Sequence, residues 1–303
     1  MFELRRLRLL HELALRGTLA SVAEALSYSP STISQQLAQL EKDAGVPLMI
    51  PDGRRLRLTE HGVALAAHAA RALELEEQIR GELESLQPGI APVRVAVLQT
   101  AAQAILPNAL TLLAGREPGL RVEIAEVPPE EGLFELSARG FDLVIAEQYP
   151  GHTRAHVRGL ERETLGSDPI RLALPPADRA RQLSDLEDRA WVMEPPGTAA
   201  RQWALQQCRA AGFEPDVRFE IADLTAQVRL IAAGRAVGVL PDLVWADIDP
   251  PVRLLDLPGH PVREIFTAAR ASSASRTGIR AVRNALQDAF AERSDTRRGH
   301  RTT

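Results

Sequence analysis

The sequence has few of the features that cross-link a chain covalently or hold it in a membrane. It contains one cysteine, Cys208, among 303 residues, so no disulfide can form within the chain. No stretch approaches the roughly 18 uninterrupted apolar residues that a membrane-spanning helix needs. The first residues, Met1–Arg5, lack the apolar core of a secretory signal. These absences predict a cytoplasmic protein that has no membrane partner.

A strong bias of charge is missing as well. The formal net charge is −4, and Lys42 is the only lysine, because the other basic residues are arginine. Charged residues make up 25% of the chain, which is ordinary for a soluble globular protein. The molecule as a whole is therefore not a polybasic nucleic-acid binder, and any contact with DNA has to come from a local surface.

Catalytic motifs are also absent from the sequence. We find no P-loop, no nucleophile elbow and no glycine-rich dinucleotide loop. His152 and His156 are four residues apart, but no cysteine or set of carboxylates accompanies them. We therefore expect no enzyme activity, no catalytic residue, no cofactor and no metal site.

The N-terminal segment begins with leucines that recur every three residues and predict a helix, which Gly17 can end. These residues are Leu4, Leu7, Leu10 and Leu13. A short second helix is expected over Ser21–Leu26, with either Thr18 or Ser21 as its cap. Ser27–Tyr28 then forms a tight turn before a third helix.

The third helix has a clear start, because Ser29 can cap the first backbone N–H groups and Pro30 suits the first helical position. Its apolar residues share one buried face: Ile33, Leu37 and Leu40. The opposite face is small and polar: Ser31, Gln35, Ala38 and Lys42, flanked by Thr32, Ser34 and Gln39. Amides and hydroxyls of this size suit a DNA major groove. The pattern indicates a helix-turn-helix, and its alternative is an ordinary helical hairpin with a solvated polar face.

The residues after the third helix favour the DNA-binding interpretation. Residues 46–49 are expected to be extended, and Asp52-Gly53 is a dipeptide typical of a hairpin turn. The next strand, Arg54–Thr59, alternates basic and apolar residues. This arrangement predicts a wing whose arginines reach phosphates or a narrow minor groove. A merely solvated basic hairpin is the alternative.

A long helix is expected from Thr59 to Gln87, since this stretch has no proline and Pro88-Gly89 ends it. Apolar residues follow it at intervals of three or four: Leu65, Ala69, Ala72, Leu75, Ile79, Leu83 and Leu86. A small head cannot bury a seam of this length, so we expect a partner helix and hence a dimer. Packing of the seam against the chain's own body is the alternative.

The rest of the chain alternates strands and helices, which predicts parallel sheets with covering helices. The first three strands are expected at Val93–Leu98, Val122–Ile124 and Asp142–Ala146, and Pro107 is expected to kink or restart the helix after the first of them. Later strands are expected at Ile170–Leu174, Trp191–Met193, Val217–Ile221, Val237–Leu240, Val252–Leu255 and Glu264–Ala268. Helices are expected at Thr198–Ala211, Leu224–Ala233 and Thr277–Phe290.

Two helix starts in this body are candidate ligand contacts. Gln99-Thr100 follows the first strand and opens a helix, and Thr198 opens another after Gly197. Exposed N–H groups and hydroxyls at two facing helix starts would suit a small anion or carboxylate. The alternative is that Thr100 and Thr198 act only as helix caps.

The order of elements in the head resembles the LysR-type transcriptional regulators. The matching residues are Leu7–Leu10, Gly17–Leu19, Ala23–Leu26, Ser29–Leu37, Leu40–Glu41, Gly45–Leu48, Gly53–Arg55, Leu58–Thr59 and Gly62. Weaker matches lie in the body at Asp142–Ile145, Ala211–Pro215 and Ala233–Pro241. The head departs from the family at Ala20, Pro30 and Ile50-Pro51, and the two prolines remove two contacts with DNA that the family commonly makes.

This resemblance implies an α/β protein with a winged helix-turn-helix at residues 1–60 and a dimerising linker helix at 61–88. It implies a two-lobed effector domain at 89–292, similar to a type 2 periplasmic binding protein, with a chain crossing near Thr164 and another near Phe266. Lobe 1 would comprise about 89–163 and 267–292, and lobe 2 about 164–266. The polar, arginine-rich tail, 293–303, is expected to be disordered. The expected partners are double-stranded DNA, a small-molecule effector such as a carboxylate or an amino acid, RNA polymerase, and further copies of the chain in a homotetramer.

The sequence therefore predicts a DNA-binding transcriptional regulator controlled by a small molecule. The expected DNA contacts are Ser29, Ser31, Thr32, Ser34, Gln35, Arg54 and Arg55, and the expected effector contacts are Gln99, Thr100 and Thr198. A ligand-binding module like a solute-binding protein, with no role on DNA, is the alternative. An enzyme built on the α/β body is less compatible with the absence of catalytic motifs.

Overall fold

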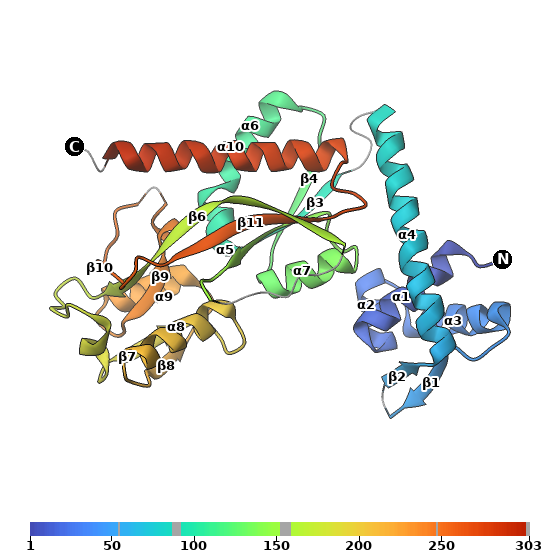
Figure 1. Ribbon diagram of the computed structural model, residues 1–303, viewed down its shortest axis with the longest axis horizontal. Coiled ribbons are helices and arrows are strands. Elements are labelled where there is room, and N and C mark those ends of the chain that lie inside the picture. Colours follow the sequence, from blue (N-terminus) through green and yellow to red (C-terminus); the bar gives the residue numbers. More distant parts are fainter. Residues whose placement is uncertain (54, 87–91, 152–158, 247, 301–303) are drawn as a thin grey trace.

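The computed structural model describes residues 1–53, 55–86, 92–151, 159–246 and 248–300. A small N-terminal head and a larger α/β body lie side by side, and one long helix runs from the head along the edge of the body (Figure 1). No helix among the described residues combines the length and the apolar character that crossing a membrane requires.

The head consists of three helices and a hairpin: α1 (Leu4–Arg16), α2 (Leu19–Leu26), α3 (Pro30–Ala44), β1 (Met49–Asp52) and β2 (Arg55–Leu58). Thr18, and not Ser21, caps α2, since its hydroxyl accepts from the Ser21 N–H. Ser29 caps α3 and Pro30 occupies its first turn, as predicted. The α3 residues Ile33 and Leu40 are fully buried against α1 and α2, which confirms the predicted apolar face.

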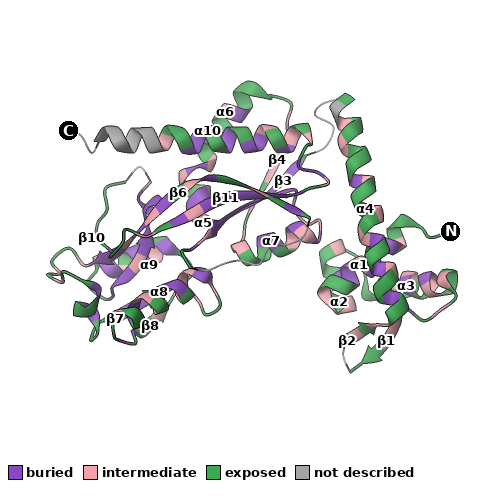
Figure 2. Cartoon of the chain, viewed as in Figure 1, coloured by how far each residue is buried: buried purple, intermediate pink, exposed green. Residues whose placement is uncertain are grey.

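Helix α4 (Glu60–Leu86) has two environments along its length. Near the head, Ala66, Ala69 and Leu73 are buried, and α4 packs closely along α1. Beyond them, four large apolar side chains of the predicted seam are exposed: Leu75, Ile79, Leu83 and Leu86. Figure 2 shows this part of α4 largely in the colour of exposed residues. The chain's own body therefore does not cover the distal half of the seam.

The body contains a six-strand path in the order β10-β6-β11-β5-β3-β4, with β9 paired to β6. Its strands are β3 (Val93–Val97), β4 (Val122–Glu126), β5 (Leu143–Gln148), β6 (Leu160–Leu174), β9 (Gly238–Pro241), β10 (Arg253–Asp256) and β11 (Val262–Arg270). A separate parallel pair is formed by β7 (Ala190–Met193) and β8 (Asp216–Glu220). The helices are α5 (Gln99–Ala104), α6 (Leu106–Arg116), α7 (Pro129–Ser137), α8 (Ala199–Ala210), α9 (Leu224–Ala232), α10 (Thr277–His300) and the short η1 (Leu183–Leu186) and η2 (Asp242–Trp245).

The sheet is mixed, which differs from the predicted parallel sheets. Strand β3 is parallel to both β4 and β5, but β11 runs antiparallel to both β5 and β6. The polar first part of β6, Leu160–Pro169, was not predicted as a strand. It contains many charged residues and few apolar ones, so it lacks the alternation typical of a strand. Antiparallel pairing follows from the path of the chain, since β6 carries it toward one end of the body and β11 carries it back (Figure 1).

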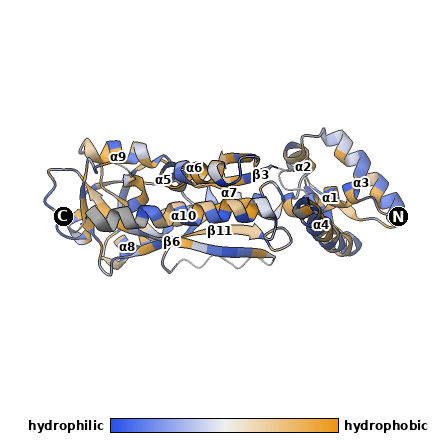
Figure 3. Ribbon diagram, turned by 90° about the horizontal axis from the view of Figure 1, so that it is seen from above, coloured by the Kyte–Doolittle hydropathy of each residue, from blue (hydrophilic) through white to orange (hydrophobic). Residues whose placement is uncertain are grey.

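Both faces of the central strands are covered, which explains their continuous apolar sequence. Val95 and Ile145 pack with α6 and α10, whereas Ala96 and Val144 pack with α7 on the other face. Figure 3, seen from above, shows α10 lying along the body next to β6 and β11. A second apolar region, around Trp191, lies between α8, β7 and β10 and is separate from the first. A further cluster, which includes Leu224, Ile231 and Leu240, lies on the same side of the body as Trp191, so each end of the body has its own buried apolar residues, as two lobes require.

The C-terminal tail differs from the prediction of disorder from residue 293. Helix α10 continues to His300, beyond the predicted end at Phe290. No proline follows Phe290, so nothing in the backbone chemistry stops the helix there. Residues 301–303 lie outside the described part of the chain.

The start of α4 offers a test of head packing. A Cβ at Gly62 would lie 2.0 Å from the carbonyl oxygen of Leu48, so Gly62→Ala should lower the free energy of unfolding by about 2 kcal/mol through overpacking. Gly115, in α6, has nothing near its Cβ position, and Gly115→Ala should be neutral or stabilising by up to about 1 kcal/mol. Urea unfolding followed by circular dichroism checks both, and equal effects would contradict the packing at Gly62.

Candidate functional site

The outer face of α3 presents the small polar side chains that the sequence singled out. Ser31, Ser34 and Gln35 are exposed, and Thr32 is half-buried. Ser29 is exposed too, but its hydroxyl is occupied, because it accepts from the Thr32 N–H at 3.1 Å and lies 2.9 Å from the Ser31 hydroxyl. The backbone of α3 therefore holds these side chains on one solvent-facing surface.

The hairpin places basic side chains beside α3. Arg55 is exposed at the start of β2 and lies opposite Asp52 in the strand register. Arg57 is exposed as well, and residues two apart on a strand share a face. Arg57 thus lies on the same face of the wing as Arg55, although it was not among the expected DNA contacts. The alternation of basic and apolar residues along this strand could have indicated it. Arg54 lies outside the described residues.

A cavity of about 630 Å³ opens between the two regions of the body. All three residues predicted to meet a ligand line it: Gln99, Thr100 and Thr198. Gln99 connects its two sides, because its amide nitrogen donates to Asp223 at 2.8 Å and its amide oxygen accepts from the Leu224 N–H at 3.0 Å. Thr198 caps α8 by accepting from the Arg201 N–H. Thr198 is therefore both a helix cap and a residue that lines the cavity.

Thr100 is fully buried and belongs to an ion network that the sequence did not reveal. Arg263 donates to the Thr100 hydroxyl at 2.7 Å and to Asp168 at 2.9 Å, and it also pairs with Glu147. Burial alone would lower the pKa of Arg263, but the charges of Glu147 and Asp168 outweigh it and raise the pKa. Arg263 sits in the apolar strand β11, so no local pattern marked it.

Acidic side chains make up most of the charge around this cavity. Glu126, Glu130, Glu147, Glu194 and Asp223 all line it. Glu147 and Glu194 follow directly upon the apolar runs 143–146 and 191–193, and a polar residue at the end of a buried strand was the signal that could have found them. The largest effect on Glu194 is burial, which together with the charge of Glu147 raises its pKa to about 7.

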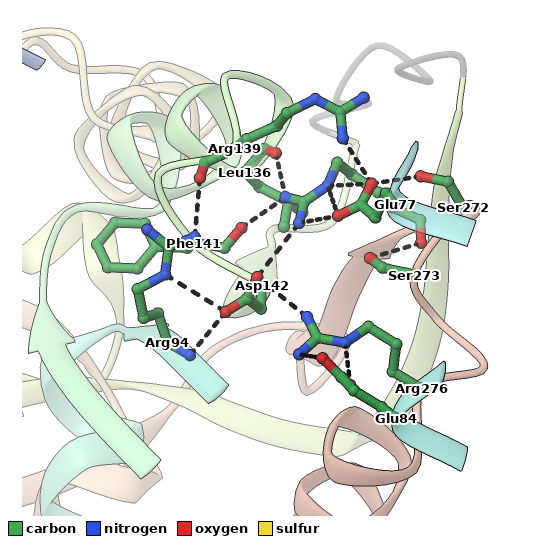
Figure 4. A network of polar contacts seen from close by, with 11 residues as sticks. Glu77, Glu84, Arg94, Leu136, Arg139, Phe141, Asp142, Ser272, Ser273 and Arg276 are labelled. Carbon is green, nitrogen blue, oxygen red and sulfur yellow. Dashed lines mark hydrogen bonds and ion pairs between the residues drawn. The ribbon is translucent and has the colours of Figure 1, made fainter. Parts of the chain in front are cut away.

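A junction joins α4 to the body through buried ion pairs (Figure 4). Glu77 of α4 accepts from Arg270 at 2.6 Å and 2.9 Å, from Arg139 at 2.6 Å and from Ser272 at 2.6 Å. Burial by itself would raise the pKa of Glu77, but the hydrogen bonds and charge of Arg270, with help from Ser272 and Arg139, lower it to about 2. The carboxylate is therefore ionised at neutral pH and holds two arginines of the body.

Two further ion pairs extend this junction, one near the distal end of α4 and one on the head. Arg276 holds Glu84 of α4 in a two-point pair at 2.7 Å and 2.8 Å. On the head itself, Arg16 of α1 pairs in the same way with Glu135 of α7, at 2.7 Å and 2.8 Å. The guanidinium of Arg16 also lies over the Phe134 ring, 5.3 Å from its centre, which is close enough for a cation–π contact. The orientation of the head relative to the body thus rests on charged hydrogen bonds.

Cys208 is a core residue of α8 with no exposed surface. Burial, together with the nearby charge of Glu214, raises the pKa of its thiol to about 12. The thiolate is the reactive form of cysteine, and this environment disfavours it. Cys208 therefore packs as a small buried hydrophobe.

No cluster of three or more potential metal ligands occurs among the described residues. His152 and His156, whose spacing the sequence analysis considered, lie outside that part of the chain.

Two family descriptions match the chain. Residues 4–63 match "Bacterial regulatory helix-turn-helix protein, lysR family", and residues 89–291 match "LysR substrate binding domain". Among curated relatives, the transcriptional dual regulator GltC of Bacillus subtilis is 26% identical and the alignment covers 82% of this chain and 83% of GltC. The transcriptional activator IlvY of Salmonella typhimurium is 28% identical, over 83% of this chain and 86% of IlvY.

Solved structures share the fold at low identity. A full-length OxyR variant from Pseudomonas aeruginosa has a TM-score of 0.64 at 22% identity, covering 96% of this chain and 95% of that one. Full-length CbnR in complex with its target DNA has a TM-score of 0.54 at 21% identity, covering 95% of this chain and 99% of that one. The head, the long helix and the two-region body therefore occur together in known full-length proteins.

The junction predicts a large cost for removing one buried arginine. Arg270→Ala leaves the Glu77 carboxylate short of its main partner, so we expect the free energy of unfolding to fall by about 3 kcal/mol. The matched control is Arg116→Ala, whose pair with Asp288 is half-exposed and should contribute less than about 1 kcal/mol. Urea unfolding at pH 7 measures both variants, and equal losses would contradict a dominant role for the junction.

Proposed function

The chain belongs to the LysR family of DNA-binding transcriptional regulators, and on this premise we propose that α3 and the β1–β2 hairpin form the surface that meets DNA. The protein has an effector-binding domain and is not an enzyme. The family match over the head removes the alternative of a ligand-binding module with no role on DNA. We propose the cytoplasm as its location, as the family implies.

One observation supports this surface above the others: the polar face of α3 is solvent-exposed while its apolar face is completely buried. In the proposed arrangement Gln35 pairs with a base edge, and Ser31, Thr32 and Ser34 meet base edges or phosphates. Ser29 contributes through its position at the start of the helix, since its hydroxyl already serves as the cap. Arg55, Arg57 and Arg54 supply the phosphate or minor-groove contacts of the wing.

We propose domain limits of 1–60 for the head, 61–88 for the linker helix and 89–292 for the effector domain. The family matches over residues 4–63 and 89–291 support these limits. Within the effector domain, the separate apolar clusters at the two ends support two lobes. The antiparallel strands β6 and β11 join these lobes, and we place the limits near the paired residues Thr164 and Phe266. Contact with RNA polymerase and assembly into a homotetramer remain implied by the family.

The proposed effector site is the cavity at Gln99, Thr100 and Thr198, and its ligand is a small carboxylate or an amino acid. Support comes from its size, since about 630 Å³ falls in the range of small-molecule sites. Further support comes from Gln99, which bonds across the cavity to Asp223 and Leu224. A ligand that enters here has to break or rearrange this bridge, so occupancy can change how the two lobes close.

Strand β11 supports a route from this cavity to the head. Arg263 near one end of β11 lies at the cavity, and Arg270 at the other end holds Glu77 of α4. Seven residues of extended chain separate them, which is roughly 23 Å at about 3.3 Å per residue. The strand is paired on both sides, with β5 and β6. A shift at Arg263 can therefore move α4, and two paired heads with it.

We propose that α4 forms the dimer contact. The exposed apolar residues Leu75, Ile79, Leu83 and Leu86 support this, because nothing described in the chain covers them. A dimer would bring two heads to two half-sites of an imperfect palindrome, as pairs of helix-turn-helix units require.

The DNA surface is tested by gel-shift titrations with the DNA upstream of the chain's own gene, at several salt concentrations. Gln35→Ala should weaken binding to this DNA by about 5- to 150-fold and change random-DNA binding little, because base contacts specify sequence. Arg55→Ala should weaken both and reduce the salt slope by about one unit. Arg121→Ala, which removes an exposed arginine of the body, is the control and should do neither. Upstream DNA that binds no better than random DNA would refute the proposal.

The dimer contact is tested by placing a charge in the seam. Leu83 is 59% exposed in the single chain, so Leu83→Glu should fold normally but weaken dimerisation by at least about 100-fold, since a buried unpaired carboxylate is costly. Ile248→Glu, at a similarly exposed apolar residue of a body loop, is the matched control. Analytical ultracentrifugation measures the dissociation constants, and a Leu83→Glu protein that stays dimeric would place the interface elsewhere.

A further inference from the structure

We propose that the ligand of the effector cavity carries a positively charged nitrogen, an ammonium or a guanidinium group, and binds with that group toward Glu194. The inference rests on the proposed role of the cavity as the effector site. Of the two ligand classes proposed above, small carboxylates and amino acids, this favours amino acids, and it adds amines of similar size.

The charges that line the cavity are mostly of one sign. Five carboxylates line it, from Glu126, Glu130, Glu147, Glu194 and Asp223, and Arg263 is the one basic side chain among the lining residues that the structure describes. Charges concentrated in a low-dielectric cavity attract the opposite charge more strongly than they would in water. An anionic ligand would have to overcome this field, whereas a cation would be drawn into it.

Arg263 is not available to a ligand carboxylate. Its side chain is only 2% exposed, and its three guanidinium nitrogens donate to Asp168, Glu147 and Thr100. Two carboxylates already compensate its single positive charge. The group that would most readily have bound an anion is therefore used within the protein.

At the start of α8, where Thr198 suggested an anion, and at the neighbouring start of α9, backbone N–H groups bond to the chain's own oxygens. The Arg201 N–H at the start of α8 donates to Thr198. The Thr225 N–H at the start of α9 donates to Asp223, and the Leu224 N–H donates to Gln99. Because these three donors already face oxygens of the chain, they are not open to a ligand anion.

Glu194 is the carboxylate best placed to meet a cation. It follows β7, lines the cavity, and makes no ion pair with any arginine or lysine in the described ranges. Burial and the charge of Glu147 disfavour its ionised form and raise its pKa to about 7. A bound ammonium group offsets both effects, because it supplies the missing counter-charge.

The test uses isothermal titration calorimetry on the full-length chain with matched probes. The amines are L-arginine, L-lysine, agmatine and putrescine, and succinate and citrate are the anions. L-Citrulline is the neutral counterpart of L-arginine and L-norleucine that of L-lysine. We expect at least one amine to bind, and at least tenfold more tightly than a neutral counterpart or either anion.

Two variants locate the binding. Glu194→Gln keeps the size of the side chain and removes its charge, so it should weaken amine binding at least tenfold. Glu214→Gln, at an exposed acid that pairs with Arg209 away from the cavity, should bind the amine like the unmodified chain.

Binding of the anions alone, binding of neither class, or an amine affinity that Glu194→Gln leaves unchanged would overturn the inference. Gel shifts on the same preparations separate this failure from failure of the proposed function. Retained binding to the upstream DNA with no response to amines contradicts the ligand class only. If the unmodified chain binds the upstream DNA no better than random DNA, the proposed DNA surface is contradicted instead.

Discussion

The buried carboxylate of Glu77 is the interaction on which the arrangement of the molecule depends. It belongs to the helix that carries the head, yet its partners Arg139, Arg270 and Ser272 all belong to the body. A charge removed from water is tolerated only when its partners compensate it, so the position of α4 is tied to the positions of those groups. Arg276 with Glu84 and Arg16 with Glu135 extend the same principle along the junction. Charged hydrogen bonds depend on geometry more strongly than apolar contacts do, which makes such a junction sensitive to small shifts.

That sensitivity gives the cavity a physical connection to the head. Strand β11 carries a buried arginine near each end, Arg263 at the cavity and Arg270 at the junction. Between them the strand is paired on both edges, with a bulge at Ile265/Phe266 in its pairing with β6. A ligand that rearranges Arg263, or the bridge from Gln99 to Asp223, acts on the same strand that positions Glu77. The proposed regulation therefore needs no large rearrangement within a lobe.

Local patterns predicted the head well because its elements are set by short-range chemistry. Ser29 and Pro30 begin α3, and Gly45 ends it in the left-handed conformation that glycine adopts readily. The exposed or buried position of each α3 residue followed from the helical period. Gln99, Thr100 and Thr198, the expected effector contacts, all line the cavity, since each lies where a strand or loop gives way to a helix, and their contact with an effector stays a prediction. Arg263 could not be selected, because no residue near it in the sequence indicates the carboxylates that surround its side chain.

The sequence by itself determined the family, the order of the elements and the polar face of α3, since these depend on residues close together in the chain. The tertiary structure decided which charges meet. Glu77 and Arg270 are separated by 193 positions and Thr100 and Arg263 by 163, yet each pair is in direct contact. It also decided the character of the cavity. Two helix starts suggested an anion, but folding bonded donors at the starts of α8 and α9 to Thr198, Asp223 and Gln99 and surrounded the space with carboxylates. The reason is physical, because the electrostatic field of a site is the sum of groups that only the folded chain assembles.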